Sequence, residues 1–312
     1  MLLPKNLNQI NTDMFKKLSL ITLITLFMSF TALACSDDSS TGPDADEPSI
    51  VEIAADNEAF STLVDALVNT GVVSALEGDG PFTVFAPTND AFDNLPEGTL
   101  ESLSNDQLAE ILTYHVIRAE IFSSALQPEQ SATTLSGEDI FVTVGNGVRV
   151  NNSATVVDAD LAASNGVIHV VDGVILPDAF GDIVDNAAKR YFLSSLVEAV
   201  VTADLAGALS NESAELTVFA PTNEAFEAIA DVAAGLTVEE LTNILLYHVV
   251  DSRVLSTDLA AGEQTVQTLN GESITINVGD GGVTVNGSAS VTAADVNGTN
   301  GVIHVINEVL LP

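Results

Sequence analysis

The hydrophobic positions of this chain run through the same order twice. Each copy begins with apolar residues at helical spacing, and Gly71 follows the first of these segments in the place of a helix C-cap. Such stripes predict helices that turn one face toward a core. The positions are Phe60, Leu63, Val64, Leu67 and Val68 in the first copy, and Leu193, Leu196, Val197, Val200 and Val201 in the second.

The clearest repeat is the stretch 82–92, which returns as 216–226. Its leading residues are apolar or β-branched, which predicts a buried strand. A proline then ends the strand, because it has no N–H for the ladder and restrains the residue before it. Thr88 and Thr222 follow as N-caps, so each copy is predicted to contain a strand, a corner and a short helix.

A further helix of each copy is predicted to begin with a capping box, at 104–107 and at 237–240. Apolar residues follow at helical spacing, and His115 and His248 continue that stripe at the carboxyl end. Because a helical stripe faces the core, we expect these histidines to be buried and hydrogen-bonded. Each follows a tyrosine, whose ring we expect to pack with its hydroxyl near the surface.

The later half of each copy has the pattern of strands. Glycine-containing turns between β-rich runs predict one hairpin per copy. The runs are 140–144 and 148–150 in the first copy, and 274–278 and 283–285 in the second. Each copy closes with Asn-Gly-Val-Ile-His-Val, at 165–170 and 300–305. Helices early and strands late predict an α+β fold with two tandem domains, 49–178 and 179–312.

The first 35 residues are predicted to be an export signal rather than part of the fold. Two lysines precede the apolar run 18–33, and small residues lead to Cys35. The segment 31–35 resembles the signal box of bacterial lipoproteins, so 1–35 is interpreted as a lipoprotein signal peptide and Cys35 as the site of lipid attachment. An ordinary signal peptide cut nearby is the alternative. Cys35 is the only cysteine, which excludes an intrachain disulfide.

Residues 36–48 are polar and acidic, which predicts a disordered tether. The formal charge of the whole chain is −36, and such a surface repels nucleic-acid phosphates, so no nucleic-acid partner is expected. Hydrophobic residues make up 46% of the chain, which favours globular domains over disorder. The acidity is interpreted as a solvated surface.

The ordered motifs resemble those of the fasciclin domain: the strand and corner at 82–92, the tyrosine–histidine pair and the closing segment, all present twice. The resemblance covers effectively all of the chain beyond the tether. It implies a β-wedge or sandwich with several packed helices in each domain. It also implies adhesion to a matrix or a cell rather than catalysis.

The resemblance further implies candidate residues for ligand contact. In animal members, a Tyr-His segment and an Asp-Ile pair before the closing strand are the proposed integrin-binding elements. Here the Asp-Ile pair carries another aliphatic residue in place of isoleucine. The matching residues are Tyr114, His115, Asp160 and Leu161 in the first domain, and Tyr247, His248, Asp295 and Val296 in the second. A structural role is the alternative for all of them; for both aspartates it is a turn made by side-chain-to-backbone bonds.

Neither a cofactor nor a metal site is predicted. The sequence has no Gly-x-Ser-x-Gly elbow, no phosphate-binding loop and no zinc-like cluster, and its acids show no paired spacing for general acid–base work. We therefore expect a protein that is not an enzyme.

Together these patterns predict an exported lipoprotein, anchored in the outer membrane through an acyl chain and exposed at the cell surface. Its expected function is adhesion to extracellular matrix, a cell-surface protein or a polysaccharide. The alternative is a periplasm-facing module of the cell envelope that binds a small ligand, polysaccharide or partner protein, or serves as a spacer.

Overall fold

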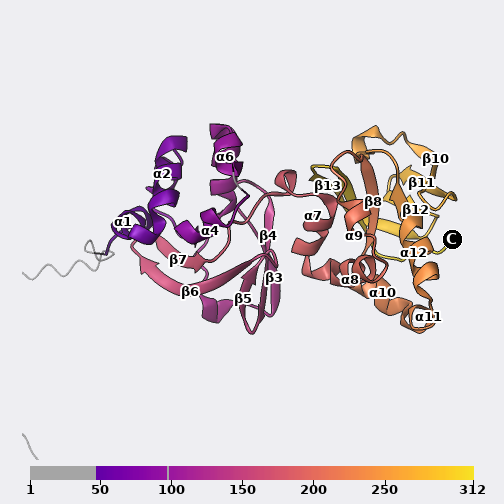
Figure 1. The fold of residues 1–312 in the computed structure, drawn as a ribbon, viewed down its shortest axis with the longest axis horizontal. Helices are drawn as coiled ribbons and strands as arrows, with labels where there is room; N and C mark the ends of the chain where they lie inside the picture. The colour runs from indigo at the N-terminus through magenta and orange to yellow at the C-terminus, as the bar shows by residue number, and fades with distance from the viewer. Residues whose placement is uncertain (1–46, 97) are drawn as a thin grey trace, which may run out of the picture. The chain divides into compact units, whose positions relative to one another are not determined.

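The computed structural model describes residues 47–96 and 98–312 (Figure 1). The predicted signal peptide, Cys35 and most of the tether lie outside the described residues. The elements α1 to β7, here called the first domain, recur in the same order as α7 to β14, the second domain. The predicted bounds of the two domains, 49–178 and 179–312, stay a prediction.

In each domain the helices come before the strands, except that the first strand lies between the third and fourth helices. Those of the first domain are α1 (Ile50–Asp56), α2 (Ser61–Thr70), α3 (Val73–Leu76), α4 (Asn89–Asp93), α5 (Thr99–Ser102) and α6 (Asn105–Tyr114). Those of the second are α7 (Ile183–Lys189), α8 (Ser194–Thr202), α9 (Ala206–Leu209), α10 (Asn223–Ala228), α11 (Ala230–Ala233) and α12 (Val238–Tyr247). Short 3₁₀ turns are η1 (Glu58–Phe60), η2 (Ser123–Ala125), η3 (Asp178–Phe180), η4 (Tyr191–Leu193) and η5 (Ser256–Asp258).

The strands of each domain form one seven-stranded sheet. In the first domain they are β1 (Phe82–Pro87), β2 (Val116–Ile117), β3 (Glu129–Thr133), β4 (Asp139–Gly145), β5 (Gly147–Val150), β6 (Ala154–Ala163) and β7 (Gly166–Val171). In the second they are β8 (Leu216–Pro221), β9 (Val249–Val250), β10 (Gly262–Gln267), β11 (Ser273–Gly279), β12 (Gly282–Val285), β13 (Ala289–Gly298) and β14 (Gly301–Ile306).

The strand order is β2-β1-β7-β6-β5-β4-β3, and the second sheet repeats it as β9-β8-β14-β13-β12-β11-β10. Among the described strands of each sheet, only the pair made by the two motif strands is parallel: β1 lies beside β7, with Phe85 opposite His169, and β8 lies beside β14. The other pairs are antiparallel. The first and last motifs of each domain are therefore neighbouring central strands. This is the α+β architecture that the sequence predicts.

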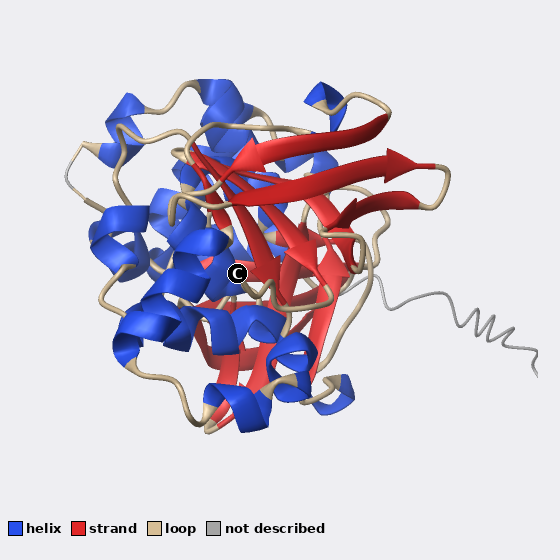
Figure 2. Cartoon of the chain, turned by 90° about the vertical axis from the view of Figure 1, so that its right-hand side faces the viewer, coloured by secondary structure: helices blue, strands red, loops and turns tan. Residues whose placement is uncertain are grey.

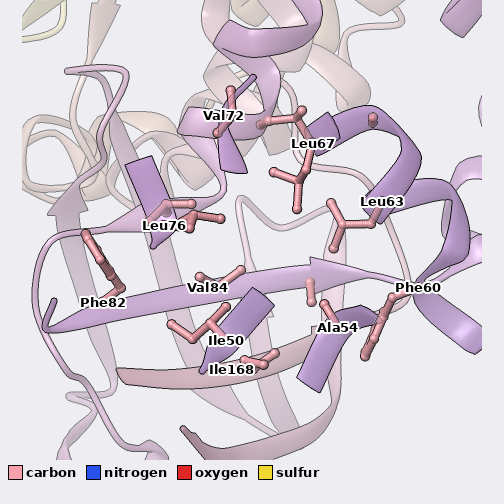
Figure 3. Packing of buried hydrophobic residues seen from close by; sticks show 14 of the residues in the cluster. Ile50, Ala54, Phe60, Leu63, Leu67, Val72, Leu76, Phe82, Val84 and Ile168 are labelled. Carbon is pink, nitrogen blue, oxygen red and sulfur yellow. The ribbon is translucent and has the colours of Figure 1, made fainter. Parts of the chain in front are cut away.

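Both faces of β1 are buried, because a core lies on each side of it. Phe82, Val84 and Ala86 pack with α1, α2 and α3 in one cluster (Figure 3). Phe85 points the other way, into a second cluster with strands β4 to β7. The second domain repeats both clusters, and Figure 2 shows most helices of the chain, in blue, to one side of the strands, in red. This double burial explains why the strand is continuously hydrophobic rather than alternating.

Short motifs in the sequence correctly predicted where several helices begin or end and where the hairpins turn. Both capping boxes are formed, with Ser104 bonded to Gln107 and Thr237 to Glu240. Gly71 ends α2 with a left-handed φ of 73°. Both hairpins are also confirmed. The helical stripes are wrong at one position each, because Val68 and Val201 are 64% and 63% exposed.

Candidate adhesion site

The tyrosine–histidine pair of each domain lies where a helix enters a strand. In the first domain α6 ends at Tyr114, His115 is its C-cap, and β2 begins at the next residue. The side chains are enclosed: Tyr114 is 0% exposed and His115 is 2% exposed. The equivalent Tyr247 and His248 are 5% and 1% exposed. These four candidate residues therefore offer little side-chain surface to a ligand.

The tyrosine hydroxyl joins α6 to the hairpin. The Tyr114 hydroxyl donates to the carbonyl of Asp139 at 3.0 Å and accepts from the amide of Asn151 at 2.9 Å. The predicted exposure of this hydroxyl is wrong, because the hairpin covers it. Burial raises the pKa of Tyr114 above its ordinary value, so the phenol stays protonated. Tyr247 makes the matching bonds, to Ser273 and Asn286.

The histidine of the pair ties the helix end to the chain that leaves the domain. Nδ1 of His115 lies 2.7 Å from the Ile111 carbonyl, and Nε2 accepts from the Ile175 N–H at 3.1 Å. Because the Ile175 N–H can only donate, the neutral ring carries its proton on Nδ1. His248 does the same with the Ile244 carbonyl and the Leu310 N–H. The predicted burial and bonding of these histidines is confirmed.

Burial sets the protonation state of both histidines. Desolvation lowers the pKa of His115 and of His248 to about 4, and the bond to the helix carbonyl only partly opposes it. Both rings are therefore neutral at pH 7. A neutral ring whose two nitrogens are both used inside the domain serves as a structural link rather than as an acid or base.

The aspartates lie in long strands at an irregularity. Asp160 in β6 has a φ of 62° and Asp295 in β13 a φ of 60°, and the pairing registers of both strands shift there. The carboxylate of Asp160 accepts from the N–H of Ser123 at 2.7 Å and from its hydroxyl at 2.5 Å. Asp295 accepts the same two bonds from Ser256.

These bonds correct the expected role of the aspartates. The structural alternative for each was a turn made by side-chain-to-backbone bonds, whereas the bonded Ser123 lies 37 residues before Asp160. The hydroxyl and N–H of Ser123 lower the pKa of Asp160, which keeps the carboxylate ionised. Its own N–H donates to Nδ1 of His169 at 3.2 Å, and Nε2 of that ring lies 2.8 Å from the Ile121 carbonyl. The closing histidine thus holds the bulge in place.

The fold does not bring the two motif pairs of a domain onto one strand or one edge. Tyr114 and His115 lead into β2, whereas Asp160 and Leu161 lie in β6, and both β1 and β7 separate these strands. Leu161 is half-buried against the helical core, as is Val296 in the second domain. Asp160 and Asp295 are half-buried as well. Cys35 lies outside the described residues.

Two grooves were missed by the sequence analysis. One, of about 670 Å³, follows the hairpin of the first domain and is lined by residues that include Glu129, Thr143, Asn146 and Arg149. The other, of about 390 Å³, shares Glu129 and Thr143 and continues to residues of η4 and α8. The strand signal at 140–150 predicted the hairpin, but the groove also needs residues outside that run, such as Glu129, which no local signal places beside it.

In the described part of the chain, no three histidine, cysteine, aspartate or glutamate side chains lie together as a metal site. Within the same residues, no helix has both the length and the apolar character to span a membrane.

Both halves of the chain match one family. The sequence model of the Fasciclin domain matches residues 58–177 and 192–312. The chain therefore belongs to the fasciclin family and carries two fasciclin domains in tandem. Fasciclin domains are commonly linked to adhesion or binding in extracellular proteins.

Three known proteins show how far the similarity extends. Protein sll1483 of Synechocystis sp. is 54% identical over 132 residues, which are 41% of this chain and 73% of that protein. Periostin of Homo sapiens is 34% identical over 245 residues, which are 76% of this chain but 29% of periostin. A solved FAS1 domain pair from the insect cell adhesion molecule Fasciclin I covers 81% of this chain and 97% of its own, with a TM-score of 0.56 and 19% identity. That likeness shows the fold.

Proposed function

We propose that this chain is an adhesion lipoprotein that attaches a cell to a matrix, a polysaccharide or a neighbouring cell through its two fasciclin domains. The observation that carries the proposal is the pair of fasciclin domains, an arrangement it shares with the domain pair of an insect cell adhesion molecule. The internal bonding of the motif side chains leaves them unavailable as acids or bases, which counts against catalysis at these residues. His115, His248 and Tyr114 all form hydrogen bonds within their own domains.

The proposed location is the outer membrane, with the domains at the cell surface and an acyl chain on Cys35 as the anchor. The support is in the sequence: the order of charge, apolar run and small residues before Cys35, and the acidic tether after it. A single acyl chain binds membranes reversibly, so firm anchoring needs a second chain or another contact.

For the contact surface we propose the groove of about 670 Å³ beside the hairpin. Its lining combines an amide, hydroxyls, a carboxylate and the guanidinium of Arg149, which can all bond to sugar hydroxyls or to a peptide backbone. Arg149 is exposed, and one of its nitrogens donates to the Asn152 carbonyl at 2.7 Å. In the second domain Thr284 occupies the equivalent strand position. The motif residues Asp160, Leu161, Asp295 and Val296 remain a second candidate surface.

The first experiment locates the protein. Intact cells that carry the wild type or Cys35→Ala are treated with protease, and each protein is partitioned between detergent and water. A surface lipoprotein is digested on intact cells and enters the detergent phase, whereas Cys35→Ala stays in the aqueous phase. Wild-type protein that enters detergent but resists protease until the outer membrane is opened instead faces the periplasm. The alternative, an envelope binding or spacer module, would then replace adhesion.

The second experiment tests adhesion itself. Cells without the gene are complemented with wild type, Arg149→Thr or the matched control Thr284→Ser, and attachment and aggregation are measured. We expect deletion to abolish the attachment that the wild type restores, and Arg149→Thr to restore less of it than Thr284→Ser. Attachment that survives deletion unchanged would contradict the proposed function, whereas equal rescue by both variants would contradict only the groove.

A further inference from the structure

One strand of the first domain is buried on a face that its counterpart in the second domain leaves open. In β4 the three successive residues Ile140, Phe141 and Val142 are all buried. Ile140 and Val142 belong to the core of the first domain, and Phe141 points to the opposite side of the strand. In β11 the alternation is ordinary, with Ile274 and Ile276 buried and Thr275 between them half-exposed.

Residues of the second domain cover Phe141. The rings of Tyr191 and Phe192 lie edge-on to it, with centroids at 6.2 Å and 5.7 Å. The guanidinium carbon of Arg190 lies 5.0 Å above its ring, within the range of a cation–π contact. Edge-to-face rings and a stacked guanidinium are the geometries that aromatic contacts favour. Phe141 is consequently only 6% exposed.

The covering residues are those at which the two copies differ. At the end of α1 the first domain has an exposed, mostly polar run, and at the end of α7 the second domain has a cationic and aromatic run. The first run is Asp56, Asn57, Glu58 and Ala59, and the second is Lys189, Arg190, Tyr191 and Phe192. Two complementary changes, Phe141 on one side and this run on the other, thus meet at a single contact.

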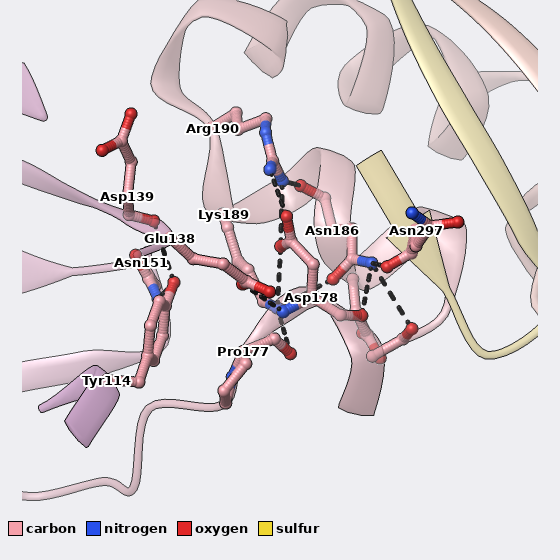
Figure 4. A network of polar contacts seen from close by, with 12 residues as sticks. Tyr114, Glu138, Asp139, Asn151, Pro177, Asp178, Asn186, Lys189, Arg190 and Asn297 are labelled. Carbon is pink, nitrogen blue, oxygen red and sulfur yellow. Dashed lines mark hydrogen bonds and ion pairs between the residues drawn. The ribbon is translucent and has the colours of Figure 1, made fainter. Parts of the chain in front are cut away.

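A buried ion pair lies beside the aromatic contact (Figure 4). The carboxylate of Asp178 accepts from Arg190 at 2.5 Å, and Nζ of Lys189 lies 3.4 Å from it. All three side chains are at least 86% buried, with 14%, 8% and 9% of their surfaces exposed. Lys189 also donates to the amide oxygen of Asn186 at 2.7 Å. The two cations therefore share the Asp178 carboxylate, and each also donates to an oxygen of Asn186.

The linker between the domains is hydrogen-bonded at Ile175, Pro177 and Asp178. The Ile175 N–H donates to His115, and the Pro177 carbonyl accepts from Lys189 at 3.2 Å. The Asp178 N–H donates to the Glu138 carboxylate at 2.9 Å, and its carbonyl accepts from Asn186 at 2.8 Å. Glu138 and His115 belong to the first domain, whereas Asn186 and Lys189 belong to the second. Both domains therefore hold the same few linker residues.

We propose that this junction is a built interface that fixes the two fasciclin domains as one rigid body. Tandem domains move relative to one another by default unless a packed interface prevents it. Here the aromatic contact, the buried ion pair and the bonded linker act together. The functional consequence, which goes beyond adhesion itself, is that the protein presents its two domains at a fixed spacing. It therefore selects ligands that match this spacing.

The test is the width of the distance distribution between the domains, measured by pulsed electron paramagnetic resonance on the full chain. Replacing Cys35 by alanine removes the only native thiol, and labels are attached to Val68→Cys and Val201→Cys, which occupy equivalent exposed helix positions. We expect a single narrow distribution. The variant Phe141→Thr/Arg190→Asn carries at each place the residue of the other copy, and it is expected to broaden the distribution at least about twofold.

The control Thr275→Ser changes the equivalent position on β11 and should leave the distribution unchanged. Circular dichroism and urea unfolding show whether each variant is folded, and Phe141→Thr alone replaces the double variant if that chain does not fold. A broad distribution in the parent protein overturns the proposal, as does a narrow one that the variant leaves unaltered. Neither result depends on whether the protein is an adhesin.

Discussion

The two domains share one set of buried contacts, here called the framework, but differ on the outer face of one strand. Tyr114 and Tyr247 bond to equivalent asparagines, and His115 and His248 accept from equivalent N–H groups at the domain ends. In contrast, the position held by Phe141 in β4 is held by Thr275 in β11, and the side chain at this position points away from the core of its own domain. The repeated residues therefore define the domain, whereas the departures from the repeat define how this domain joins the other.

The framework includes buried polar side chains as well as apolar ones. The buried Asn165 accepts from the Ile50 N–H at 3.0 Å and donates to the Leu76 carbonyl at 2.7 Å, which joins the closing strand to the helices. Asn300 makes the same links to Ile183 and Leu209. Buried backbone groups need such partners, so the asparagine is a requirement of the fold in both copies.

The substitutions expected to destabilise the protein most test whether the framework contributes equally to the stability of both domains. Gly166 and Gly301 begin the closing strands, and a Cβ there would lie 2.0 Å from the Phe82 carbonyl oxygen and 2.3 Å from that of Leu216. Gly166→Ala and Gly301→Ala should each destabilise their own domain by more than about 4 kcal/mol, because neither backbone can move aside without parting the parallel strands. Urea unfolding of each full-length variant measures this.

The control for these glycines is a pair of positions with room for a methyl group. At Gly78 and Gly235 the nearest atoms to a new Cβ lie at 3.9 Å and 3.6 Å, so alanine there should change stability by less than about 1 kcal/mol. A strong effect of Gly166→Ala without one of Gly301→Ala would show that the two closing strands are not equivalent.

The next effect is confined to the junction. Asp178→Ala leaves the charges of Lys189 and Arg190 buried without their partner, and we expect a loss of about 3 kcal/mol in the free energy of unfolding. The comparison is the pair of half-buried Arg253 and exposed Glu215, 3.8 Å apart, and Glu215→Ala should lose less than about 1 kcal/mol. Thermal and urea unfolding give both values. Equal losses would mean that the junction charges are as solvated as the surface pair.

Much of the framework was predictable because its signals are local. The capping boxes, the hairpin turns and the helical position of His115 depend on residues within a few places of one another. Each pattern also occurs in both copies of the repeat, which argues against a chance match. The predicted α+β fold, which rests on such local patterns, is confirmed.

The partners of the site residues were not predictable, because they are distant in the sequence. Nothing near Asp160 indicates Ser123, and nothing near Tyr114 indicates Asn151. Phe141 did leave a signal: three apolar residues in succession at 140–142, where the other copy alternates at 274–276. Such a run in one copy of a repeat indicates a strand covered on both faces.

A change of pH should affect both domains alike. The folded pKa of His115 and of His248 is about 4, below the ordinary value of 6.5. Because the folded state favours the neutral ring, each histidine contributes to the free energy of unfolding. This contribution is complete above pH 6.5 and is lost as the pH falls toward 4. At pH 5 each domain should have lost about 2 kcal/mol. Urea unfolding at pH 7 and pH 5 measures the loss.

Single substitutions separate the histidines from the many carboxylates. In His115→Gln the first domain should lose its share of the pH dependence while the second keeps its own, and His248→Gln should do the reverse. The carboxylates are common to all three proteins, so their titration cancels in the comparison. An unchanged pH dependence in both variants would mean that the histidines are not its source.

The smallest effect decides whether the tyrosine–histidine pair binds anything. Tyr114→Phe removes a buried hydroxyl and leaves the Asn151 amide without its acceptor, so we expect a loss of about 1.5 kcal/mol in the free energy of unfolding. For Tyr247→Phe, where the ring is 5% exposed and the bonds are slightly longer, about 1 kcal/mol is expected. Both proteins remain folded, so attachment of cells that carry either variant should equal that of the wild type. Attachment that falls in a folded variant would instead make this hydroxyl part of the adhesive contact, because at that point loss of folding no longer explains loss of binding.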